Sequence, residues 1–212
     1  MKIRLIAALL GVSAFVFVSD LPSLPLSAQP PTAAVHAPLK AQFLHWAQFP
    51  IRVYIQTSNT SQKAEAQTAL SGLDEWVAAS HGKIRYVLAA SPGEADIAVK
   101  FEPVAYLSAE TKTVGETTVI FSGLILKKAS IRLAEGNSVP GNLQSAAAHE
   151  FGHALGIQNH SDDPDDLMFP TETTHFSMLG DPLFEPPHAV TAHDLRLLRT
   201  CYPQLFAVTT SH

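Results

Sequence analysis

The residues best suited to chemistry lie in one segment, AAAHEFGHALGIQNHSDDPDDLMFP, which spans residues 146–170. Within it, His149, Glu150 and His153 form an HExxH motif. On an α-helix, residues four positions apart lie one turn apart on the same face, so both imidazoles can reach a single metal ion. The spacing therefore predicts a metal site with a carboxylate beside it.

A third imidazole follows the motif. Gly156 can end the helix, because glycine adopts the left-handed conformation without steric cost, and His160 comes next on the returning chain. Three imidazole ligands favour zinc among the metal ions. Because zinc binds four ligands, three histidines leave its fourth coordination position for water. We expect one zinc ion, bound by His149, His153 and His160.

Such a site needs a scaffold, and the apolar pattern predicts one. We expect the site helix to begin at Gly141 or Asn142, and an earlier helix, capped by Thr60 or Ser61, to run to about Ser80. A short final helix begins at a capping-box-like Thr191. Strands are expected at residues 51–55, 83–89, 97–101, 118–121 and 124–133, with loops at 102–116 and 171–187.

The order of these elements indicates how the sheet is built. A strand, a long amphipathic helix and a second strand favour a parallel pair with the helix packed across the sheet. Lys127 and Lys128 interrupt the alternation of their strand, which fits a bulge, an exposed edge or simply two solvated lysines. No internal repeat and no second domain are indicated.

The N-terminus has the pattern of an export signal. Lys2 and Arg4 precede an apolar run that is short for a membrane span but suits a signal-peptide core. We expect a signal peptide at residues 1–28, a Pro/Ala-rich linker at 29–42 and one catalytic domain at 43–212. The protein would then be secreted or periplasmic, or anchored to the membrane if the signal stays uncleaved.

Composition narrows the partners. The formal net charge of −5 disfavours nucleic-acid binding, which needs a basic surface. The single cysteine, Cys201, excludes an intramolecular disulfide, and we expect it to be buried in the final helix rather than catalytic. After signal cleavage we expect no membrane contact and a monomer.

The segment HEFGHALGIQNHSDDPDDLMFP resembles the matrixin branch of the metzincin zinc peptidases, whose motif is HExxHxxGxxH followed by a methionine in a tight turn. EADIAVKF, residues 94–101, resembles the third strand of that family, and the resemblance extends from about Trp46 to Tyr202. It implies an α+β fold: a twisted, mixed, five-stranded sheet with two long helices and a short C-terminal helix. The matching motif residues are His149, Glu150, His153, Gly156, His160, Ser161 and Met168.

One departure concerns the third ligand. The family usually places its third histidine three residues after the glycine, where this chain has Asn159. Either the turn holds an extra residue and still presents His160, or Asn159 or a nearby aspartate is the ligand. We favour His160, because imidazole binds zinc far better than a carboxamide does. A bacterial subset with HExxHxxGxxxHS looks like this sequence.

The resemblance implies a secreted zinc endopeptidase, with a protein or peptide as its partner, in which Glu150 is the general base for attack by water. Met168 would lie beneath the ligands without binding zinc, and an extended substrate would follow an edge strand within residues 118–133. There is no cysteine-switch propeptide and no sign of the family's structural zinc site. The alternatives are a non-catalytic exported module that binds zinc or a partner, and a zinc hydrolase acting on a non-peptide bond.

Other polar residues are weaker candidates for a metal or catalytic site. Four aspartates after His160 offer oxygen ligands for calcium, although any solvated turn has such a composition; they are Asp162, Asp163, Asp165 and Asp166. Five further histidines have no spacing that suggests a site; they are His45, His81, His175, His188 and His193.

Overall fold

The computed structural model describes residues 2–6, 16–18, 43–103, 114–136, 142–170 and 189–207. The predicted linker, most of the two predicted long loops, His175 and His188 lie outside these ranges. The strands are β1 (Lys2–Ile6), β2 (Val16–Val18), β3 (Ile51–Ile55), β4 (Tyr86–Leu88), β5 (Ile97–Glu102), β6 (Gly115–Ser122) and β7 (Ile125–Ala134).

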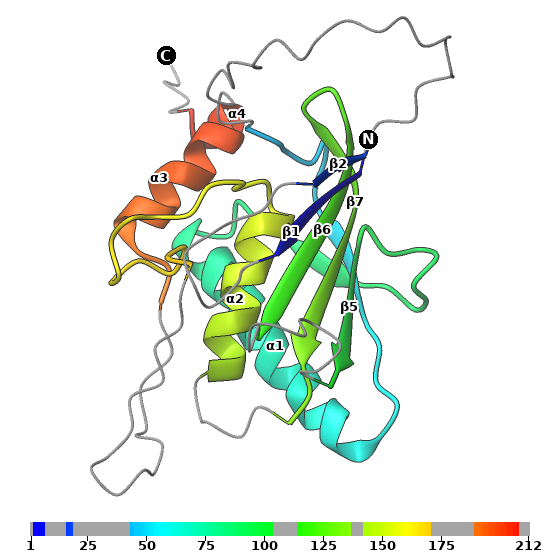
Figure 1. Ribbon diagram of the computed structural model, residues 1–212. Coiled ribbons are helices and arrows are strands. Elements are labelled where there is room, and N and C mark those ends of the chain that lie inside the picture. The colour runs from blue at the N-terminus through cyan, green and yellow to red at the C-terminus, as the bar shows by residue number, and fades with distance from the viewer. Residues whose placement is uncertain are drawn as a thin grey trace, which may run out of the picture.

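All of these strands belong to one mixed sheet, in the order β2-β1-β6-β7-β5-β3-β4 (Figure 1). Strand β3 pairs in parallel with β4 and β5, and β5 pairs in parallel with β7. Strand β6 runs antiparallel to β7. The five predicted strands are therefore β3 to β7, and the predicted parallel pair around a crossover helix is confirmed. The apolar N-terminal segment adds β1 and β2, with β1 antiparallel to β6.

The helices are α1 (Thr60–Ala79), α2 (Asn142–Ala154), α3 (Ala192–Cys201) and α4 (Pro203–Phe206). The long helices α1 and α2 lie side by side against the same face of the sheet (Figure 1). Together with the mixed sheet and the short terminal helices, this arrangement confirms the predicted α+β class. No helix within the described ranges is long and apolar enough to cross a membrane.

Helices α1 and α2 approach closely because α1 presents small residues. Its buried face includes Ala66, Ala69 and Gly72, and a Cβ at Gly72 would lie only 2.7 Å from the backbone nitrogen of Ala148. Leu70 and Val77, which the pattern placed on the buried stripe, are only partly buried. The cap also differs from the prediction: Asn59, rather than Thr60 or Ser61, accepts from the Gln62 backbone N–H at 2.8 Å.

Strand β6 begins three residues before the predicted start at Thr118, because polar residues inside it find partners. Glu116 is 1% exposed and accepts from Arg132 Nη1 at 2.8 Å, and Thr117 bonds to α2. The register between β6 and β7 shifts after Ile120, which pairs with Lys128 while the next residue pairs with Leu126. The lysine pair thus lies at a bulge and is exposed.

The end of α2 is fixed by residues far apart in the sequence. Trp46 Nε1 donates to Ala154 O at 2.9 Å, and the buried Tyr202 hydroxyl donates to Leu155 O at 2.6 Å. These bonds satisfy carbonyls that a helix leaves without partners at its C-terminus. Cys201 beside Tyr202 is 3% exposed, as predicted, and burial raises its thiol pKa to about 12. These hydrogen bonds hold the end of α2 in place, and with it the start of the segment that follows.

Candidate metal centre

His149 and His153 lie one turn apart on α2 and are both buried. His149 Nδ1 is 2.8 Å from Leu167 O, and His153 Nδ1 is 2.7 Å from Ile157 O. A carbonyl oxygen only accepts, so each Nδ1 must bear the proton and each Nε2 keeps its lone pair. Backbone carbonyls thus fix the tautomer that presents Nε2 to a metal ion.

The turn after α2 brings the third imidazole back to the first two. Gly156 has φ +116°, and a Cβ on it would lie 2.0 Å from Leu44 O, so only glycine fits here. Ile157 N donates to Gly152 O at 3.1 Å, closing the helix end. Asn159 forms an exposed bend. The extra residue is therefore accommodated at the surface, and His160 turns inward.

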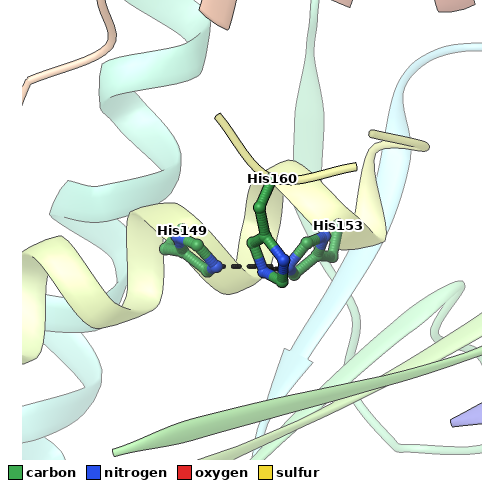
Figure 2. A group of neighbouring side chains, drawn as sticks. All are labelled: His149, His153 and His160. Carbon is green, nitrogen blue, oxygen red and sulfur yellow. Dashed lines mark hydrogen bonds between the residues drawn. The ribbon is translucent and has the colours of Figure 1, made fainter. Parts of the chain in front are cut away.

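The three Nε2 atoms converge. Those of His149 and His160 each lie 3.1 Å from that of His153, and ligand atoms of all three lie within 4.8 Å of one another. Figure 2 shows the three rings directed toward a common region, two from α2 and one from the segment above it. Tetrahedral zinc with Zn–N bonds of about 2.0–2.1 Å places its nitrogens about 3.3 Å apart. The donor set and the two separations of 3.1 Å fit zinc.

The surroundings disfavour protonation of these imidazoles. Burial lowers the pKa of His149, and burial together with the two neighbouring imidazoles lowers that of His153 well below its usual value. Burial and the charge of a protonated His149 lower the pKa of His160 to about 4. Neutral imidazole is the form that binds metal, so the site is prepared for a cation at neutral pH.

Glu150 points from α2 toward β6. It is 2% exposed, and its Oε2 accepts from the Thr117 hydroxyl at 2.5 Å. Burial raises the pKa of the carboxyl to about 8, an increase that the hydrogen bond from Thr117 partly offsets. A nearby dication would favour the ionised form. A buried carboxylate on the residue next to His149 could act as a general base once it is ionised.

Met168 supports α2 from below. It is fully buried, and a Cβ at Gly152 would lie 2.4 Å from the Met168 sulfur, so the missing side chain of Gly152 makes room for the thioether. The buried Asp194 accepts from the backbone N–H groups of Leu167 and Met168, at 3.1 Å each, and of Thr191, at 2.8 Å. Asp194 thereby positions the Leu167 carbonyl that orients His149.

A second network lies behind His160. Asp166 accepts from the hydroxyls of Ser161 and Thr191 and from His193 Nδ1, each at 2.5 Å. Burial raises the pKa of Asp166, but these three donors outweigh burial and hold the pKa below its ordinary value. His193, for which the sequence suggested no role, thus ties α3 to the loop after His160. Calcium binding by the aspartates stays a prediction.

The family model for matrixin matches residues 45–179, which is more than half of the chain and includes the three histidines and Glu150. The chain belongs to the matrixin family. Matrilysin of Felis catus is 48% identical over 40 residues, an alignment that covers 19% of this chain and 15% of that protein. The chain thus matches only a small part of this curated relative.

Membership places this matrixin in a family of zinc-dependent metallopeptidases, and its three histidines form a group able to hold a metal ion. The predicted ligands His149, His153 and His160 and the predicted base Glu150 all lie in one buried region. Sequence reasoning missed Thr117 and Asp194. The capping-box pattern marks Asp194 as structurally important, whereas nothing in a β-strand pattern marks Thr117 as a partner of Glu150.

Proposed function

We propose that this matrixin is a secreted zinc-dependent endopeptidase. The observation that supports it most strongly is the convergence of three imidazoles. The Nε2 atoms of His149 and His160 each lie 3.1 Å from that of His153, and the buried Glu150 follows His149 directly in the helix. A site with only a structural role has no need of Glu150, whereas hydrolysis needs a base.

His149, His153 and His160 would hold one zinc ion, with carbonyls of Leu167 and Ile157 keeping two of the rings in the correct tautomer. Zinc supplies Lewis acidity, which polarises a scissile carbonyl and acidifies water. Glu150 would take a proton from the attacking water and deliver it to the leaving amine. Met168 packs beneath the helix and keeps the ligands in place without binding the metal.

The substrate would lie extended along β6. This strand adjoins the site directly, since Thr117 bonds to Glu150, and its outer edge pairs with β1 from Lys2 to Ile6. Cleavage of the expected signal peptide, residues 1–28, would remove β1 and expose backbone groups to which a peptide strand can pair. The mature protein would then be a monomer with its catalytic domain at residues 43–212.

An unbiased peptide-library digest by the zinc-loaded chain without residues 1–28 tests the proposal. Internal cleavage of peptides supports an endopeptidase. Zinc binding without any cleavage would favour the alternative, a non-catalytic exported binding module. If the chain instead hydrolyses only esters or amides that are not peptides, it is a zinc hydrolase of another kind.

A further inference from the structure

Thr117, a residue of the sheet, contacts the carboxylate of Glu150 on α2. Thr117 of β6 is fully buried, and its hydroxyl lies 2.5 Å from Glu150 Oε2 and 3.1 Å from the Glu150 backbone oxygen. A hydroxyl has one hydrogen to donate, and the shorter contact is to the carboxylate. A nearby dication would favour the ionised carboxylate, and hydrogen bonds to a charged acceptor are the stronger ones. Thr117 therefore fixes one oxygen of Glu150.

The other oxygen is fitted against the same strand. A Cβ at Gly115 would lie 2.7 Å from Glu150 Oε1 and 2.6 Å from its Cγ, distances that real Cβ atoms do not adopt. Gly115 and Thr117 are two positions apart on β6, so they lie on the same face of the strand, the one toward α2. Gly115 leaves room for Oε1, while Thr117 donates to Oε2.

We propose that Thr117 is a positioning residue for Glu150. By donating to Oε2, its hydroxyl selects the carboxylate orientation and leaves Oε1, beside Gly115, as the oxygen that exchanges a proton with water. The inference rests on the proposed peptidase function. Thr117 itself touches neither substrate nor metal in this role, so its loss should slow turnover rather than weaken zinc or substrate binding.

The test compares Thr117→Val, which keeps the side-chain shape but lacks the donor, with Thr117→Ser, which keeps the donor. Thr200→Val is the matched control, since Thr200 is an exposed residue of α3 whose hydroxyl contacts carbonyls of its own helix. Each protein, zinc-loaded and without residues 1–28, is assayed for peptide cleavage. We expect kcat of Thr117→Val to fall about 10- to 100-fold, while KM and zinc content stay unchanged. Thr117→Ser and Thr200→Val should stay near the wild-type rate.

A second readout does not depend on activity. In metal-free protein labelled with ¹³C at glutamate Cδ, the Glu150 resonance, assigned with Glu150→Gln, should shift in Thr117→Val and stay in place in Thr200→Val. If Thr117→Val does not fold, Gly115→Ala decides, because its added methyl group should displace Oε1 and lower kcat.

The outcomes separate the two claims. No cleavage by the zinc-loaded wild-type chain overturns the proposed function and this role with it. Cleavage that Thr117→Val, or Gly115→Ala in its place, leaves unchanged overturns the positioning role alone. So does a loss that appears in KM or zinc content instead of kcat.

Discussion

The Nε2 atoms of His153 and His160 lie 3.1 Å apart, although the turn between Gly156 and His160 contains one residue more than the usual matrixin motif. The additional residue is absorbed by an exposed bend at Asn159. The shifted histidine therefore still lies beside the other two imidazoles, and the three form a group that could hold a metal ion.

Replacing His160 tests this assignment directly. We expect His160→Ala to weaken zinc binding by more than about 100-fold, beyond the usual cost of losing an outer-shell contact. Asn159→Ala is the matched control and should bind zinc normally, since its side chain is exposed. Competition with a fluorescent chelator measures both affinities. Weaker binding in Asn159→Ala than in His160→Ala would assign the third ligand to the asparagine.

The turn itself depends on Gly156. Alanine there must adopt φ +116° and place its Cβ 2.0 Å from Leu44 O, so Gly156→Ala should lower the free energy of unfolding by at least about 2 kcal/mol. Gly93→Ala is the control, because nothing lies within 4 Å of a Cβ at that position. Urea unfolding measures both, and equal stability of the two variants would contradict the turn geometry.

Metal-free protein should lose stability on mild acidification. The pKa of His160 is lowered from 6.5 to about 4 by burial and by His149. Between these two values the unfolded chain binds a proton that the folded chain does not, so the free energy of unfolding falls as pH drops. The loss from this group is up to about 3 kcal/mol. Urea unfolding between pH 7 and pH 4 should show a smaller loss for His160→Asn; identical pH profiles would contradict the shift.

We expect Asp194 to affect the zinc affinity of the site without binding the metal itself. Its carboxylate accepts from the backbone N–H groups of Leu167 and Met168, and an amide in its place would turn a donor toward one of them. We expect Asp194→Asn to lose about 1–3 kcal/mol of unfolding free energy and to bind zinc about 10- to 100-fold more weakly. Asp165→Asn, at an exposed position, is the control. Unaltered zinc affinity in Asp194→Asn would show that the Leu167 carbonyl does not need this support.

The positions of His149 and His153 followed from sequence alone, because helical periodicity fixes their separation. The fold was also predictable, since β3, β5 and α1 have clear apolar patterns. The start of β6 was not, because Glu116 and Thr117 look like loop residues until their partners Arg132 and Glu150 are known. Local patterns do not encode such contacts between distant elements.

The placement of His160 shows the same limit. Residue types favoured it as the third ligand, but the path of the turn depends on how closely the backbone of Gly156 approaches Leu44, more than a hundred residues earlier. The role of His193 with Asp166 was missed for a similar reason. Tertiary contacts, rather than spacing along the chain, decide both.

In the proposed mechanism, Glu150 acts as the base at a zinc site formed by three histidines. The most direct measurement compares cleavage of an unfolded protein by the zinc-loaded wild-type chain and by Glu150→Gln, with zinc content determined in both. We predict equal zinc content and a loss of cleavage of about 10²- to 10⁴-fold in the variant. Equal cleavage by the two proteins would show that Glu150 is not the base.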